Sequence, residues 1–402
     1  MTTSPEPSFG FGIEEEYFLV DRHTRDLAEL PPDLISRLEA RLGKRFSTEY
    51  MRSQIEVATP VCTTAQEARG ALMRSRRLIG YLVEDEGLAP IAAGSHPFAR
   101  WRDQRHTPTE RYDAVAEDLQ ALGRRLLVNG LHVHVGIEDD DERIALLNDL
   151  RSYLPVLLAL STSSPFWQGE ATGLKSYRTA INTAQPRQGL SERWTDWPDY
   201  ARSVDVLVRA GVIEDASKIW WDLRPSARFP TLEMRISDVC PLVEDAVSIA
   251  SLFRCLCRRA WRLRRAGEVP APHSLLLVNE NRWRAQRYGM EKGLIDLQGE
   301  GMIEFARLLD GILESIAEDA AHLDCVAEVE HARSIVERGT SADRQLARFE
   351  RLRGLGMPRK AALMGVVDLL IEETTASTAL SRRTGRMWVH PAYTPPGAGR
   401  TA

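Results

Sequence analysis

Four short segments of the chain alternate apolar and charged residues with the two-residue period of a β-strand. They read GIEEEYFLV, SQIEVATP, LHVHVGI and TLEMRISDV, at residues 12–20, 53–60, 131–137 and 231–239. Side chains of a strand point alternately to its two faces, so each segment has one mainly apolar row and one row with charged or imidazole groups. A chain with this pattern is expected to form an antiparallel sheet that buries one face under helices and gathers the charged groups on the other.

The charged rows of these segments together make a candidate metal site. Segment by segment they contain Glu14 and Glu16, then Glu56, then His132 and His134, then Glu233 and Arg235. Carboxylates gathered on one face repel one another and take up protons unless cations lie among them. Oxygen ligands with an imidazole beside them suit Mg²⁺ or Mn²⁺ better than a structural Zn²⁺, which Cys or more His residues would hold. The spacing therefore predicts a divalent-metal site, and a plain solvated sheet face is the alternative.

A metal site of this kind implies a nucleotide, because Mg²⁺ held by a few carboxylates usually keeps waters and binds substrate phosphates. The sequence has no Walker A motif: the nearest stretch, GEATGLKS at residues 169–176, misses the required spacing by one residue. ATP is therefore expected to bind through metals and basic side chains. The candidates are Lys175, Arg178 and Arg235, since a guanidinium binds phosphate or carboxylate in bidentate fashion. For any single arginine the alternative is a surface salt bridge.

Composition narrows the class of protein further. The 402 residues carry a formal net charge of -5 and are 43% hydrophobic, which provides for a sizeable core and argues against a general nucleic-acid binder. The first residues lack the pattern of a signal peptide, and no run of about 18 apolar residues occurs. The five cysteines show no CxxC spacing, which is typical of free thiols in a reducing compartment. We therefore expect a cytoplasmic protein that binds no membrane.

The order of strand-like and helical segments predicts an α+β fold. We expect a catalytic part at 1–240, a helical part packed on it at 241–380, and a loosely ordered tail at 381–402. The periodicity predicts helices over 32–42, from Thr63 or Thr64 towards Gly87, over 110–127, over 141–160 with a kink at Pro155, and over 243–266, 302–336 and 343–375. The segment 165–199 is rich in Gly, Ser, Thr, Pro and Trp without periodicity, which indicates a long functional loop or lid.

The motifs also carry a family resemblance. GIEEEY, SQIEVATP, GSHPF, NGLHVHVG, SYRTA, WWDLRP and TLEMRISD occur in that order between residues 9 and 241. Together they make the chain resemble the type 2 glutamate–cysteine ligases, also called carboxylate–amine ligases. The resemblance implies a fold similar to that of glutamine synthetase, in which a curved antiparallel sheet has helices on its convex face and binds ATP and divalent metals on its concave face.

The resemblance also implies roles for particular residues. The implied metal ligands are Glu14, Glu16, Glu56, His132 and Glu233, with Glu49 as a further acidic residue near the metal or the substrate amine. Arg235 is implied to lie near the transferred phosphate, and Arg178 to clamp a substrate or phosphate. Whether His134 joins the site stays open.

The implied reaction has two steps. ATP first phosphorylates the carboxylate of the acid, and the amine of the second substrate then displaces phosphate to form an amide. Glutamate and cysteine are the implied substrates, γ-glutamylcysteine the product, and a homodimer the implied assembly. Closure of residues 169–199 would keep water from the acyl phosphate.

Other readings of the sequence stay open beside the ligase. A kinase-like phosphotransferase of the same fold, a non-catalytic nucleotide or metal binder, and a scaffold assembled through the helical half are the alternatives. Five tryptophans either line an acceptor site or serve ordinary packing, namely Trp167, Trp194, Trp197, Trp220 and Trp221.

Overall fold

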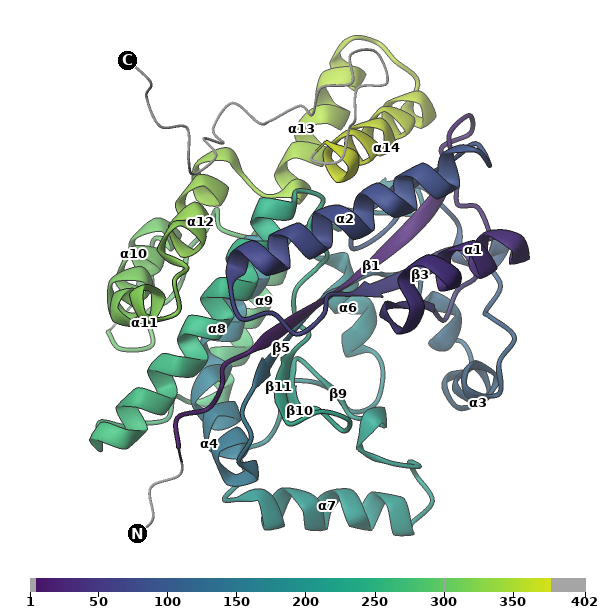
Figure 1. Cartoon of the computed structure of the whole chain (residues 1–402). Helices are drawn as coiled ribbons and strands as arrows, with labels where there is room; N and C mark the ends of the chain where they lie inside the picture. The colour runs from purple at the N-terminus through teal and green to yellow at the C-terminus, as the bar shows by residue number, and fades with distance from the viewer. Residues whose placement is uncertain (1–4, 300, 377–402) are drawn as a thin grey trace, which may run out of the picture.

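A seven-stranded antiparallel sheet forms the centre of the computed structural model, which describes residues 5–299 and 301–376 (Figure 1). The strands follow the order β10-β11-β5-β1-β3-β2, and β4 pairs with the far end of β1. Their bounds are β1 Phe11–Asp21, β2 Phe46–Thr48, β3 Gln54–Ala58, β4 Leu88–Ile91, β5 Leu131–Gly136, β10 Leu223–Pro225 and β11 Thr231–Met234. All four predicted strand segments therefore lie in one sheet.

The register of the sheet brings the charged rows of different strands onto one face. Glu14 of β1 lies opposite His132 of β5, and Glu16 lies opposite Glu56 of β3. On the other side of β5, Glu233 of β11 lies opposite His134. Directly opposed residues of an antiparallel pair project to the same face, so these side chains become neighbours.

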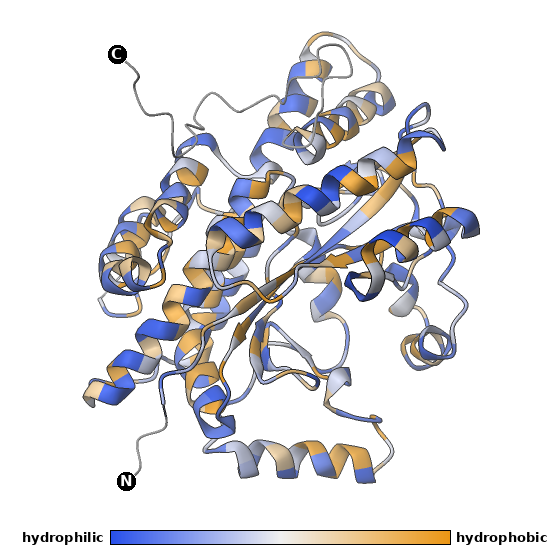
Figure 2. Cartoon of the chain, in the orientation of Figure 1, coloured by the Kyte–Doolittle hydropathy of each residue, from blue (hydrophilic) through white to orange (hydrophobic). Residues whose placement is uncertain are grey.

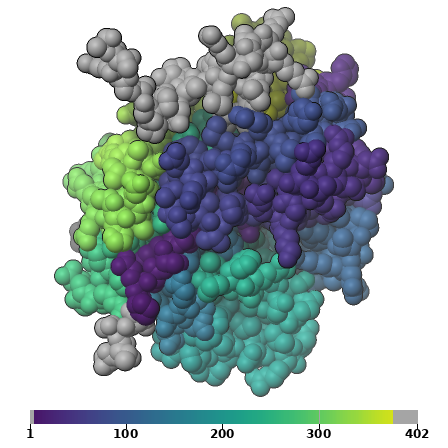
Figure 3. Space-filling model, viewed as in Figure 1, coloured from purple at the N-terminus to yellow at the C-terminus, as the bar shows by residue number. Residues whose placement is uncertain are grey.

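Helices cover the opposite, apolar face of the sheet. Helix α1 (Pro32–Leu42), α2 (Ala65–Glu84) and α8 (Val243–Ala266) lie along it in Figure 1, and the residues of α1 and α2 close over it in Figure 3. The hydropathy colouring shows apolar residues along the sheet strands and on the helices beside them (Figure 2). Helix α2 begins with the capping box of Thr64 and Glu67, one of the two starts that the sequence predicted.

One hydrophobic core joins the sheet to the helices after residue 240. A single cluster of buried side chains includes Ile13 of β1, Val133 of β5, Phe253 of α8 and Ile335 of α12. The later helices are α9 Leu275–Tyr288, α10 Phe305–Ser315, α11 Ala317–His322, α12 Val326–Arg338, α13 Ser341–Gly354 and α14 Arg359–Thr375. The helical part thus packs on the sheet, whereas its separation as a domain stays a prediction. The tail predicted at 381–402 lies outside the described residues.

Several predicted helices differ from the observed ones in length. The helix expected over 110–127 ends early, as α3 (Glu110–Leu119), because Gln120 has a φ of 48° and leaves the helical conformation. The helix expected over 302–336 is divided into β13 (Met302–Ile303), which pairs with β12 (Leu294–Ile295), and α10 to α12. Helix α9 was not predicted separately.

The predicted break near Pro155 is confirmed. Helix α4 (Asp140–Leu150) ends before the proline, a 3-10 turn follows at Arg151–Tyr153, and α5 (Leu154–Ser161) begins with the proline in its first turn. The stretch Asp140–Ser161 is long and apolar enough to cross a membrane, but 72% of its most apolar window is buried inside the protein. Packing against the sheet and α8 accounts for this apolar composition.

The prediction of a structureless lid over 165–199 is wrong for the described structure. This segment forms the hairpin β6 (Phe166–Trp167) and β7 (Glu170–Ala171), helix α6 (Tyr177–Thr183), strand β8 (Gln188–Gly189), which pairs with β9 (Trp220–Trp221), and the start of α7 (Trp197–Arg209). Ser176 and Asp196 accept backbone N–H bonds at the starts of α6 and α7. The hairpin, α6 and β8 are too short for periodicity to reveal them, and side-chain caps stabilise the starts of the two helices.

Candidate active site

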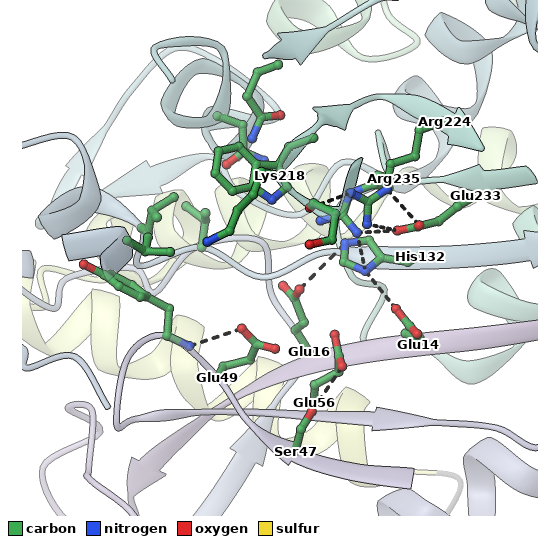
Figure 4. A pocket seen from close by; sticks show the side chains of 18 of the residues that line it. Glu14, Glu16, Ser47, Glu49, Glu56, His132, Lys218, Arg224, Glu233 and Arg235 are labelled. Carbon is green, nitrogen blue, oxygen red and sulfur yellow. Dashed lines mark hydrogen bonds and ion pairs between the residues drawn. The ribbon is translucent and has the colours of Figure 1, made fainter. Parts of the chain in front are cut away.

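The polar face of the sheet forms the floor of a pocket of about 370 Å³ (Figure 4). It is lined by all but one of the predicted site residues, namely Glu14, Glu16, Glu49, Glu56, His132, Arg178, Glu233 and Arg235, and by His134. These residues come from strands β1, β3, β5 and β11, from helix α6, from the position after β11, which carries Arg235, and from the loop before β3, which carries Glu49. The structure therefore brings together residues that lie more than 200 positions apart in the sequence.

Glu14 is the centre of a carboxylate–imidazole group. Its Oε2 lies 3.3 Å from His132 Nδ1, and its Oε1 lies 3.6 Å from His134 Nε2. Burial raises the pKa of Glu14, but the hydrogen bonds of the two imidazoles outweigh burial and hold that pKa well below its usual value. His134 Nε2 is also 3.9 Å from Glu233 Oε2, so both histidines belong to the site.

A second group consists of three carboxylates on β1, β3 and the preceding loop. Burial and the charge of Glu16 raise the pKa of Glu49 to about 8. Burial and the charges of Glu14, Glu49 and Glu16 raise the pKa of Glu56 well above its usual value. The N–H bond from Tyr50 and the charges of Arg111 and Arg235 lower the pKa of Glu49, and the charge of Arg235 lowers that of Glu56, but neither shift is reversed. This end of the pocket has a surplus of negative charge that a bound cation would relieve.

The donor atoms are close enough to share metal ions. Three sets have ligand atoms within 4.8 Å of one another: Glu14, His134 and Glu233; Glu14, Glu56 and His132; and Glu16, Glu49 and Glu56. Carboxylate oxygens dominate each set, an imidazole completes two of them, and no thiol takes part. Such donors fit Mg²⁺ or Mn²⁺.

Arginines flank the carboxylates at the β10–β11 end of the pocket. Arg224 binds Glu233 with two hydrogen bonds, Nε to Oε2 at 2.8 Å and Nη2 to Oε1 at 3.0 Å, and Arg235 also donates to Glu233. Burial raises the pKa of Glu233, but the charges of Arg235 and Arg224 hold it well below its usual value. Glu233 is thus shared between two guanidinium groups and the candidate metal set.

Arg224 is a site residue that the sequence analysis missed. It lies in the WWDLRP motif and is directly opposite Glu233 in the register of β10 and β11. Splitting that motif into its two rows, as was done for the longer strands, would have placed Arg224 on the charged face. Arg111, Lys218 and Arg228 also line the pocket, but single basic residues in loops or on exposed helix faces give no comparable signal.

Arg178 lies at the edge of the pocket and is 4% exposed. Its Nη1 donates to the carbonyl of Ile236 at 3.2 Å, and its Nη2 donates to the carbonyl of Arg235 at 3.0 Å. A Cβ atom at Gly130 would lie 2.3 Å from Nη2, so glycine is needed beside the guanidinium. Arg178 therefore fixes the backbone that carries Arg235, while its direct contact with a substrate stays a prediction.

Lys175 does not line the pocket, in contrast to the prediction that it contacts the nucleotide. Its Nζ lies 2.6 Å from Glu291 and 2.5 Å from Asp343, in the contact between the β7–α6 segment and the C-terminal helices. The sequence suggested a phosphate ligand because Lys175 is near Arg178, yet the two side chains point to different parts of the structure. Two nearby carboxylates satisfy its charge.

The tryptophans serve mainly in packing. Trp194 contacts Tyr200 and Trp221 at ring-centroid distances of 5.8 and 5.9 Å, and Trp167 contacts Tyr177 at 5.4 Å. Of the five tryptophans considered in the sequence, Trp220 is the one that lines the pocket. The packing alternative therefore holds for most of this group.

The antiparallel sheet with helices packed on its apolar face is an α+β architecture, which confirms the predicted fold class. Residues 10–363 match the family described as Glutamate-cysteine ligase family 2, and the chain belongs to this family. The family match confirms the predicted reaction class, that of an ATP-dependent carboxylate–amine ligase.

Relatives span nearly the whole chain. A protein of Rhodospirillum rubrum named "Putative glutamate--cysteine ligase 2" is 54% identical over 376 residues, which cover 92% of this chain and 97% of the relative. A protein of the same name from Paracoccus denitrificans is 45% identical over 368 residues, covering 92% and 98%.

Two solved structures share the fold at low sequence identity. The glutamate–cysteine ligase of Francisella tularensis, in complex with AMP, superposes with a TM-score of 0.66 at 13% identity and covers 90% of this chain and 88% of that one. The bifunctional glutathione synthetase of Pasteurella multocida has the same TM-score and identity, and the match covers 91% of this chain but 52% of that one. At this identity the likeness concerns the fold alone.

Proposed function

We propose that the protein joins the γ-carboxyl group of glutamate to the amine of cysteine or a related compound, with ATP as the phosphate donor. The observation that supports this proposal most strongly is the pocket itself. It combines a carboxylate–imidazole cluster with two arginines that lie on neighbouring strands and share Glu233. Membership of the ligase family supports the same reaction.

Two of the donor sets are proposed to hold Mg²⁺ or Mn²⁺. One consists of Glu16, Glu49 and Glu56, and the other of Glu14, His134 and Glu233. His132, 3.3 Å from Glu14 and 3.7 Å from Glu16, lies between them and can serve either set. Bound metals would neutralise charge on the phosphates of ATP and on the transferred phosphoryl group.

The basic side chains supply the remaining electrostatic stabilisation. Arg235 and Arg224 are placed to bind phosphate oxygens, and Arg178 holds the backbone of Arg235 in position. A carboxylate oxygen of the acid attacks the γ-phosphorus of ATP, and ADP leaves. The amine nitrogen then attacks the carbonyl carbon of the acyl phosphate, phosphate leaves with the bonding electrons, and the nitrogen loses a proton.

The test is ADP release with Mg²⁺, ATP and glutamate, with and without a panel of amines that includes cysteine, and with products identified by mass. An amide of glutamate is the expected product. ADP release that depends on the acid but needs no amine would favour the kinase-like alternative. Absence of ADP release under every condition would favour the non-catalytic alternative, which the complete set of acidic ligands makes the weaker one.

The predicted homodimer and cytoplasmic location belong to the same proposal. All five cysteines are free and buried, as expected for a reducing compartment. A monomeric mass in light scattering at micromolar concentration would contradict the dimer.

A further inference from the structure

The pocket has three chemically distinct regions, and only two of them are needed for ATP and the carboxylate cluster. The β10–β11 end carries Arg224, Arg228 and Arg235, and the middle carries the glutamates and histidines. The third region, here called the α3 wall, is apolar. It consists of Tyr112, Val115, Leu119, Leu126 and Val128.

The α3 wall is built by one face of helix α3 and the segment that leads into β5. Tyr112, Val115 and Leu119 are spaced by three and four residues, so they share a helix face. Tyr112 donates to the carbonyl of Thr48 at 3.1 Å and contacts Tyr50 edge to face at 5.7 Å. These contacts hold the α3 wall beside the neighbouring Glu49.

The β10–β11 end of the pocket has an exposed aromatic ring beside its arginines, which suits a nucleotide. Phe229, on the turn between β10 and β11, is 57% exposed and its ring lies 6.0 Å from that of His134. A nucleotide base packed on Phe229 would leave its phosphates beside Arg224 and Arg235. The acid must then meet the γ-phosphate over the carboxylate cluster, so the amine enters from the side of the α3 wall.

We propose that the α3 wall selects the amine substrate and that this substrate is an amino acid with an aliphatic side chain longer than that of cysteine. The inference rests on the proposed function. Tyr112, Val115 and Leu126 are partly exposed and, with the buried Leu119 and Val128, give the α3 wall an apolar surface that a side chain longer than CH₂–SH can cover. Arg111, which precedes Tyr112 and also lines the pocket, is placed to bind the carboxylate of such an amino acid.

The first experiment compares amines on the unmodified protein with Mg²⁺, ATP and glutamate. Hydroxylamine has no side chain, so formation of glutamyl hydroxamate tests the ligase reaction independently of the α3 wall. Leucine and methionine are expected to exceed cysteine in kcat/KM by at least about tenfold, because a single methylene in a fitting apolar pocket already contributes about that factor. They should exceed lysine and aspartate by more.

The second experiment places a charge in the α3 wall. Val115→Asp is expected to raise the KM for leucine at least tenfold, while the KM for ATP stays the same. Ala114→Asp adds the same charge to the exposed face of the same helix and serves as the matched control, with both constants unchanged. Arg111→Gln should raise the KM for leucine but not the KM for 3-methylbutylamine, which has the same side chain without the carboxylate.

The outcomes separate this inference from the proposed function. Hydroxamate formation together with a preference for lysine, aspartate or cysteine would overturn the inference and leave the ligase standing. A rise in the KM for ATP in Val115→Asp would show that the α3 wall binds the nucleotide base, which also overturns it. Failure to form hydroxamate or to release ADP would overturn the proposed function, and the inference with it.

Discussion

Strand β1 carries glutamates on both of its faces, and the two faces differ in how the charge of these glutamates is compensated. Glu15 points to the helix-covered face, where it is fully buried and paired with Arg76 of α2. Glu14 and Glu16 point into the pocket, where Glu16 contributes to the charge that raises the pKa values of Glu49 and Glu56. A carboxylate in the core is balanced by the protein itself, whereas the carboxylates of the pocket leave room for cations that arrive from solution.

The largest effect on stability is expected from breaking the buried ion pair of Glu15 and Arg76. Arg76→Leu would leave Glu15 buried without a cation and remove the hydrogen bonds of Arg76 to the carbonyls of Cys240 and Pro241. We expect a loss of about 3–5 kcal/mol in the free energy of unfolding, measured by urea denaturation. The double variant Glu15→Leu with Arg76→Leu should recover part of it. A loss below about 1 kcal/mol in the single variant would contradict this account of the pair.

The second largest effect is expected from changing one of the carboxylates that point into the pocket. Glu56→Gln removes one pocket carboxylate with little change in shape, and ADP release should fall at least about a hundredfold, as when a single electrostatic contact to the transition state is lost. The free energy of unfolding should not decrease, since the change relieves repulsion with Glu14, Glu16 and Glu49. Ser47→Ala, which removes the 3.2 Å hydrogen bond to Glu56, is the milder control. Full activity in Glu56→Gln would exclude this residue as a metal ligand.

Most of the candidate site could be predicted from the sequence, because most of its residues lie on strands. Two-residue alternation over five or more positions placed Glu14, Glu16, Glu56, His132 and Glu233 on one face, because a strand leaves each side chain only two directions. Lys175 was misplaced because it lies in a loop, where neighbours in sequence need not be neighbours in space. Arg224 was missed because its strand has only three residues.

The fold, like the site, could be predicted from the sequence only in part. Long amphipathic helices such as α8 were predicted to the residue, since their apolar stripe is set by the face that they bury. The elements between 165 and 199 depend on side-chain caps and on contacts with distant segments, such as the bond of Lys175 N to the carbonyl of Gln286. Such contacts have no local sequence signal.

A smaller effect should follow from adding a divalent cation to the protein. Mg²⁺ or Mn²⁺ at a hundredfold excess over its dissociation constant should stabilise the protein by about 2.7 kcal/mol for one site, seen as a rise in Tm. Ca²⁺, which prefers more ligands at longer distances, serves as the comparison ion. The Glu56→Gln variant should show a smaller rise than the unmodified protein. An equal rise in both would place the ion elsewhere.

The smallest effect expected is a dependence of stability on pH in the metal-free protein. The pKa of Glu49 is about 8 in the folded state and near 4.5 in the unfolded chain, so the folded state holds the extra proton between these values. Stability should therefore decrease as the pH rises from about 4.5 to 8. The decrease should be well below the full value of the pKa shift, because Glu49 is partly exposed and solvent screens its charge. Glu49→Gln should reduce this slope in urea denaturation at a series of pH values, and Glu56, whose pKa is also raised, accounts for the remainder. Mg²⁺ should flatten the slope in the unmodified protein. An unchanged slope in Glu49→Gln would mean that the difference between the two faces of β1 does not lie in uncompensated charge in the pocket.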